Sequence, residues 1–212
     1  VARQQCPYAS NFRSSTGKLR KLEALRLAQL TTPPACCLLP VAMQFAVRLV
    51  RKAMESLLRK GEIPEPPPVV PEDLASIRTG IYLSAFENPG RKPRGRVGSY
   101  LPTKPSLAEE IIHQASRLAA TFPFRKEDLP YLTYELLLTH PPSFLSTLSS
   151  LLPESGLLVR TSRGKSGVSL PGARERTPDE RFREACAQGS IDPRLEDHRV
   201  YTFAVDTITE IV

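Results

Sequence analysis

The sequence predicts an α+β fold in which most strands form antiparallel hairpins and helices lie between them. Two observations support this class. Helical periodicity is confined to three segments in the body of the chain, and short alternating apolar and polar stretches occur mostly in pairs joined by turns. The 212 residues suffice for one large domain or for two small lobes that share a core, and 41% apolar with 24% charged residues is a globular composition.

The first predicted helix runs from Met43 to Gly61, the glycine expected to end it. One face of this helix is an apolar stripe that consists of Ala46, Val50, Met54 and Leu57, and the opposite face is charged. Five prolines interrupt residues 62–71. They forbid a helix and favour a rigid extended strap between core elements over an SH3-type ligand.

A hairpin comes next, because residues 79–86 alternate as a strand and residues 87–93 have the composition of a turn. The return strand is expected from Arg94 to Ser99. It contains Gly95 and Gly98, which we expect to lie where a side chain would clash or where φ is positive.

The second predicted helix begins after Ser106 and continues to about Thr121. Ser106 lies three residues before Glu109, which is the spacing of a capping box. After a turn, residues 132–140 form a strand whose apolar face consists of Leu132, Tyr134, Leu136 and Leu138.

The last third of the chain predicts three more units. Residues 156–171 read as strand, basic glycine turn and strand, and "SRGKSG" lacks the spacing of a phosphate-binding P-loop. Residues 177–189 form a short helix capped by Thr177 or Asp179. Residues 199–212 alternate throughout and are expected to form one long closing strand.

The positive charge is concentrated in residues 1–42. This segment has six basic residues and one acid, a net +5, which leaves +2 of the chain's +7 for residues 43–212. We expect a basic extension that is poorly ordered or not native; a transit-like segment and a short helix from Lys18 to Leu30 are the alternatives. Nucleic-acid binding through this extension is a further hypothesis, which the near-balanced body disfavours.

Cysteine usage favours a reducing compartment, and we expect a cytoplasmic protein. Three of the four cysteines lie in residues 1–42, so a disulfide framework is not expected, and Cys36 and Cys37 lack further ligands at zinc spacing. No stretch is apolar enough over about 18 residues to cross a bilayer. No metal is predicted, and no motif indicates a cofactor.

The order of six segments resembles a known family. These segments are "LVRKAMESLLRKGEIPEPPP", "GIYLS", "RGRVGSYLPTKPSLAEEII", "LTYELLLTHPP", "GLLVR…GKSGVSLP" and "VYTFAVDTITE". Together they are similar to the AmmeMemoRadiSam system protein A family, which includes the domain of the human Alport-syndrome, midface-hypoplasia and elliptocytosis chromosomal-region protein. The resemblance covers about residues 45–210 and identifies residues 43–212 as the folded domain.

The resemblance implies two subdomains and a cleft beside the family signature Arg-Gly-Cys-Ile-Gly. The matching residues are Arg94, Gly95, Arg96, Val97 and Gly98, so Arg96 replaces the family's cysteine. An arginine cannot act as a thiolate nucleophile or metal ligand. Arg94 and Arg96 are two residues apart on a strand, so we expect them to project to the same face. If that face lines the cleft, they form with Gly95 and Gly98 a site for an anionic ligand or for acidic partner side chains; if it faces water, they are ordinary solvated charges.

The leading hypothesis is therefore a domain that binds a ligand or protein partner in this cleft. The family association implies Memo-like and radical-SAM proteins as partners. The alternative is an enzyme of unknown reaction, with Glu135 and His140 as acid–base groups and the arginines as anion clamps. Glu135 is expected to pair with Arg94 or Arg96, and His198 is expected in a loop.

Overall fold

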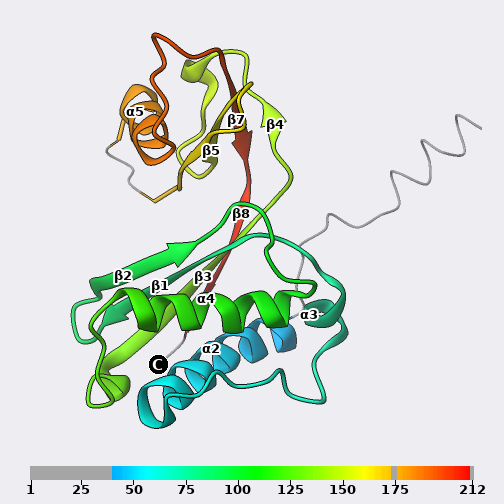
Figure 1. Ribbon diagram of the computed structural model, residues 1–212, viewed down its shortest axis with the longest axis vertical. Helices are drawn as coiled ribbons and strands as arrows, with labels where there is room; N and C mark the ends of the chain where they lie inside the picture. The colour runs from blue at the N-terminus through cyan, green and yellow to red at the C-terminus, as the bar shows by residue number, and fades with distance from the viewer. Residues whose placement is uncertain (1–39, 173–175, 211–212) are drawn as a thin grey trace, which may run out of the picture. The chain divides into compact units, whose positions relative to one another are not determined.

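Two four-stranded antiparallel sheets carry the fold in the computed structural model, which describes residues 40–172 and 176–210 (Figure 1). The first sheet has the strand order β2-β1-β3-β8 and the second has the order β4-β7-β5-β6. The predicted α+β class is thus confirmed. The described residues all belong to one compact unit, and the alternative helix from Lys18 to Leu30 lies outside them.

The elements follow in this order: α2 Pro40–Lys60, α3 Glu72–Ser76, β1 Ile81–Glu87, β2 Lys92–Gly98, α4 Leu107–Thr121, the 3-10 turn η1 Leu129–Tyr131, β3 Leu132–Thr139, β4 Ser143–Phe144, the 3-10 turn η2 Leu148–Ser150, β5 Gly156–Thr161, β6 Ser166–Ser169, α5 Pro178–Gln188, β7 His198–Phe203 and β8 Val205–Thr209.

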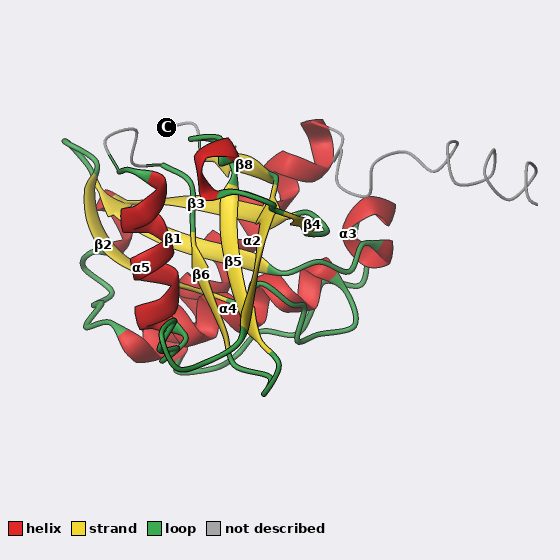
Figure 2. Cartoon of the chain, turned by 90° about the horizontal axis from the view of Figure 1, so that it is seen from above, coloured by secondary structure: helices red, strands yellow, loops and turns green. Residues whose placement is uncertain are grey.

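Helices α2 and α4 lie side by side on one face of the first sheet (Figures 1 and 2). The apolar stripe predicted for α2 packs there, since Val50 and Met54 are fully buried. They meet Ile111 and Leu118 of α4 and the inward face of β1 and β3 in one hydrophobic core. Removing these side chains from water is the main stabilising contribution to this half of the fold.

Helix α5 packs on β5 and β6 of the second sheet and encloses a smaller core. Its sequence forms a complete capping box, in which Thr177 accepts from the Glu180 main-chain N–H and the Glu180 carboxylate accepts from the Thr177 N–H. Ser106 likewise accepts from the Glu109 N–H at the start of α4. Both predicted helix starts are confirmed.

A third cluster joins the two sheets, because Tyr82 and Leu137 of the first pack with buried residues of the second. The partners are Leu158, Val168 and Phe203. Sheet-to-sheet packing of this kind requires that these residues point away from the helical face of the first sheet, as strand alternation allows.

Several boundaries differ from the sequence prediction; β2, for example, begins at Lys92 rather than Arg94. Helix α2 begins at Pro40 rather than Met43, since proline is tolerated in a first helical turn, and Ala42 is buried in the core. The expected single C-terminal strand is wrong: β7 pairs with β4 and β5 in the second sheet, whereas β8 pairs with β3 in the first. The alternation continues through Ala204 and hides this change of partner, which Figure 1 shows as two successive arrows.

Across residues 40–172 and 176–210, no helix combines the length and apolar character needed to span a membrane.

Candidate functional site

The signature strand β2 packs tightly because two of its residues lack a side chain. A Cβ on Gly95 would lie 2.6 Å from Cδ2 of Phe122, and one on Gly98 would lie 2.5 Å from the Ile81 carbonyl oxygen. Neither glycine has a positive φ, so the requirement is space. The expected close approach is confirmed at both positions.

A β-bulge separates the two arginines of the signature. Ala85 pairs with Gly95 and Phe86 with Pro93, which leaves Arg94 as the extra residue. Arg94 pairs with Glu87 (Nη1–Oε2 2.7 Å) and with Asp128 (Nη2–Oδ2 3.6 Å).

Arg96 has other contacts, since its Nε donates to Oγ of Ser84 at 2.7 Å. On β1, Glu87 lies on the same face of the sheet as the core residue Ala85, whereas Ser84 lies on the opposite face. The partner of Arg94 and the partner of Arg96 are thus on different faces. The expectation that Arg94 and Arg96 share a face is therefore wrong, and the bulge is the physical reason.

Glu135 lies on the face of Arg96 but has a different partner. Ser84 stands between them in the register, paired with Arg96 on one side and Glu135 on the other. The Glu135 carboxylate forms its ion pair with Arg91, in the turn before β2, whose guanidinium also stacks over Phe86 with 4.5 Å to the ring centroid. The expected pair with Arg94 or Arg96 is thus wrong, because the turn folds Arg91 back over the sheet.

His140 and Glu135, the candidate acid–base groups, are not brought together. His140 lies just beyond β3, five residues after Glu135, and its Nε2 is 3.0 Å from Oδ2 of Asp206 on β8. Its main-chain N–H donates to the carbonyl oxygen of Ala204 at 3.0 Å. These contacts hold His140 at the passage between the sheets.

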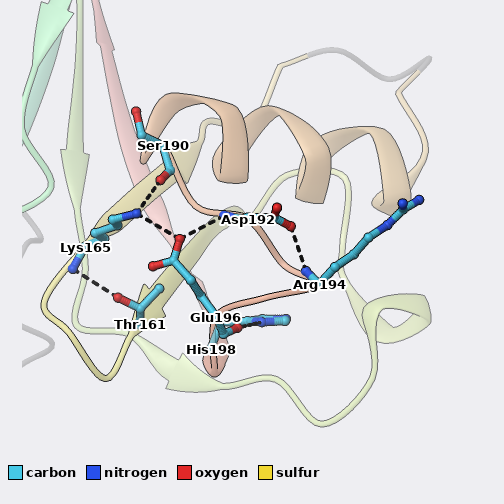
Figure 3. A network of polar contacts seen from close by, with 7 residues as sticks. All are labelled: Thr161, Lys165, Ser190, Asp192, Arg194, Glu196 and His198. Atoms are coloured by element: carbon cyan, nitrogen blue, oxygen red, sulfur yellow. Dashed lines mark hydrogen bonds and ion pairs between the residues drawn. The ribbon is translucent and has the colours of Figure 1, made fainter.

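The "SRGKSG" segment is a hairpin turn held by a polar network (Figure 3). Lys165 Nζ donates to the main-chain oxygen of Ser190 and to Oε1 of Glu196, both at 2.8 Å. His198, expected in a loop, is instead the first residue of β7, where its Nδ1 lies 3.0 Å from the Glu196 carbonyl oxygen. The two Lys165 contacts fasten the turn to the segment between α5 and β7.

A hollow of about 640 Å³ lies beside β2, within the ~300–1,000 Å³ range of ligand pockets. One side is formed by the first sheet and α4, and the other by β6 and α5. The lining residues are Tyr82, Arg96, Val97, Gly98, Arg117, Thr121, Val168, Leu170, Arg176, Glu184, Ala187 and Gln188. We call this space the β2 hollow.

The β2 hollow has a positive lining. Arg176 pairs with Glu184 (Nη1–Oε2 2.5 Å), but Arg96 and Arg117 have no ion pair with any residue in the described ranges. Tyr82 lies between the two sheets, and burial raises the pKa of its phenol well above the ordinary value, so it stays neutral. The hollow therefore offers two guanidinium groups with free hydrogen-bonding capacity.

Arg117 was missed by the sequence reasoning, and the structure shows how it is oriented. Its Nη1 donates to Oε1 of Gln114 (3.0 Å), whose Nε2 donates to Oε1 of Glu110 (2.7 Å). The fully buried Glu110 also accepts from the N–H groups of Thr103 (2.6 Å) and Lys104 (2.8 Å). Polar residues at positions 110, 114 and 117 of an amphipathic helix are the signal that could have indicated this chain.

In the part of the chain that the structure describes, no group of three or more His, Cys, Asp or Glu side chains could hold a metal ion.

Comparison with known proteins places these features in a family. A family model described as AMMECR1 matches residues 47–208. A protein of Thermotoga maritima is 28% identical over 169 residues, covering 77% of this chain and 94% of its own length. A protein of Thermococcus gammatolerans is 29% identical over 185 residues, covering 79% and 89%. The crystal structure of an uncharacterised protein from Pyrococcus horikoshii superposes with a TM-score of 0.66 at 27% identity, covering 78% of this chain and 90% of that one.

Proposed function

Because the chain belongs to the AMMECR1 family, as the resemblance to AmmeMemoRadiSam system protein A predicted, we propose that it is a binding domain. It takes the anionic groups of a ligand or protein partner into the β2 hollow. The setting that we propose is the cytoplasm, which the cysteine usage favours. Memo-like and radical-SAM proteins are the partners that the family resemblance implies.

The observation that carries this proposal is that Arg96 and Arg117 both line the β2 hollow. They come from a strand and a helix, they border the same space, and neither has a carboxylate partner among the described residues. A guanidinium binds carboxylate or phosphate oxygens through two parallel N–H donors. Two such groups beside the apolar Val168 and Leu170 suit an anionic group attached to an apolar body.

Preorganisation supports the same proposal. The Glu110–Gln114 chain fixes the Arg117 side chain before any ligand arrives, which reduces the conformational entropy lost on binding. Glu110 also holds the main chain at Thr103 and Lys104, in the segment that follows the signature hairpin. The orientation of Arg117 and the packing of the segment at Thr103 and Lys104 thus both depend on the buried Glu110 carboxylate.

The other two hypotheses receive less support. Glu135 and His140 are each engaged by a different partner, Arg91 and Asp206, so no acid–base pair is assembled. Nucleic-acid binding through residues 1–42 concerns a segment almost wholly outside the described residues and stays a prediction.

Titration with inorganic phosphate and with succinate at constant ionic strength tests the proposal. Backbone amide shifts in NMR spectra should saturate around the β2 hollow. Arg96→Gln or Arg117→Gln should weaken binding by roughly 10-fold or more, since a hydrogen bond to a charged group contributes about 1.5–3 kcal/mol. Arg59→Gln, an exposed residue near the end of α2, is the matched control. Unsaturable shifts, or equal affinity in all three variants, would refute the proposal.

A further inference from the structure

We infer that the β2 hollow receives an acidic peptide segment in extended conformation, which pairs with the open edge of β2 as an added strand. This inference rests on the proposed function, because the unpaired arginines supply the sites for the acidic side chains. It goes further by naming the class of partner and the main-chain groups that recognise it.

Strand β2 is the outer strand of the first sheet. The β2 hollow borders Arg96, Val97 and Gly98. A second hollow of about 480 Å³ borders Pro93, Arg94, Gly95 and Arg96, so Arg96 lines both spaces. Every residue from 93 to 98 therefore adjoins one of these hollows, as the site of an extended segment requires.

On this side the main chain of β2 has hydrogen-bonding groups that no residue in the described ranges uses. The Ser99 N–H donates to the Ile81 carbonyl oxygen at 3.0 Å, so Ser99 and Ile81 are a hydrogen-bonded pair of the β1–β2 ladder. Hydrogen-bonded pairs recur at every second residue of an antiparallel strand. Val97 and Gly95 therefore bond to β1, while the N–H and C=O groups of Arg96 and Gly98 point away from it. Groups two residues apart along an edge are those that an added strand uses.

The β2 hollow also encloses this edge from both faces of the sheet. Arg117 and Thr121 of α4 approach from the helical face, and Tyr82 approaches from the other. The facing outer strand, β6, differs because the Val168 N–H already donates to Oε1 of Gln188 at 2.6 Å. An incoming strand therefore finds free main-chain donors and acceptors on β2 rather than at that position of β6.

The positive charges of Arg96 and Arg117 favour a partner with acidic side chains. An added strand projects successive side chains to alternate faces, and Arg96 and Arg117 lie on different sides of the β2 edge. Acidic residues can reach both guanidinium groups, whereas Val168 and Leu170 offer an apolar surface to the residues between them. The fitting partner is an extended segment that combines acidic and apolar residues.

The test uses the full chain and the blocked heptapeptide Val-Val-Glu-Val-Val-Glu-Val, whose two glutamates are three residues apart and therefore project to opposite faces of an added strand. Hydrogen exchange measured by NMR should show the Arg96 and Gly98 amides exchanging rapidly in the free protein and at least tenfold more slowly with peptide. The Val97 amide should be protected in both states. A peptide N-methylated at alternate amides is the control and should bind much more weakly, while phosphate should compete with the unmodified peptide.

Several outcomes would overturn the inference. If the peptide binds through Arg96 and Arg117 without protecting the Arg96 and Gly98 amides, or if the N-methylated peptide binds equally well, anion binding stands but strand addition is wrong. If phosphate binds and the peptide does not, the partner class is wrong. Protection that rises with protein concentration alone would identify a second copy of the chain as the occupant. If neither probe binds, the proposed function fails as well.

Discussion

Replacing Glu110 by glutamine removes a negative charge from a fully buried side chain and leaves its shape almost unchanged. The Thr103 and Lys104 N–H groups would then donate to a neutral oxygen. The new amide NH₂ would face the NH₂ of Gln114, and turning the Gln114 amide would instead set its NH₂ against Arg117. One hydrogen bond of the chain is lost in either arrangement.

The size of the effect follows from these contacts. Hydrogen bonds to a charged group contribute about 1.5–3 kcal/mol and neutral ones about 0.5–1.5, so the two main-chain bonds weaken by about 1 kcal/mol each. The lost Gln114 bond adds about 1 kcal/mol, and the smaller cost of burying a neutral group offsets part of the sum. We expect the free energy of unfolding to fall by about 2 kcal/mol.

Urea unfolding followed by circular dichroism measures this change. Glu109→Gln is the matched control, because it removes the same charge from the first turn of α4 at a position with partial solvent exposure. The control should lose about 0.5 kcal/mol or less. If Glu110→Gln and Glu109→Gln differ by less than about 0.5 kcal/mol, the buried carboxylate does not organise this region, and the preorganisation of Arg117 is refuted.

Three further predictions follow from single contacts. Gly98→Val should lower the free energy of unfolding by about 2–3 kcal/mol, because its Cβ would lie 2.5 Å from the Ile81 oxygen; a neutral result in urea unfolding would contradict the close approach. Arg96→Cys, which restores the family residue, should cost about 1 kcal/mol or less in the same assay, since Arg96 is exposed; a collapse of the fold would show an anchoring role. The hydrogen bond from Lys165 lowers the pKa of Glu196, so this carboxylate stabilises the fold above its ordinary pKa of about 4.3 and less as pH falls toward its folded value. Glu196→Gln should therefore flatten the loss of stability in acid, and an unchanged pH profile would argue against the ion pair.

The helices and hairpins could be predicted because their signals are local. The apolar stripe of α2, the caps at Ser106 and Thr177 and the glycines of β2 all act within a few residues. The geometry of the candidate site could not be predicted in the same way, since it depends on contacts between residues that are far apart in sequence. The bulge at Arg94 is defined only by the register against β1, and nothing near Glu135 indicates that Arg91 returns to it.

The change of sheet at Ala204 determines on which side the two sheets are connected. The chain passes between the two sheets twice, between β3 and β4 and again at Ala204, and the His140 N–H joins these passages by its bond to the Ala204 oxygen. Both passages leave from β3 and β8, whereas β2 is at the opposite end of the strand order. The covalent connections between the sheets, and the hydrogen bond that joins them, therefore lie on the β3–β8 side of the first sheet. The β2 hollow borders the opposite side of that sheet, away from both connections.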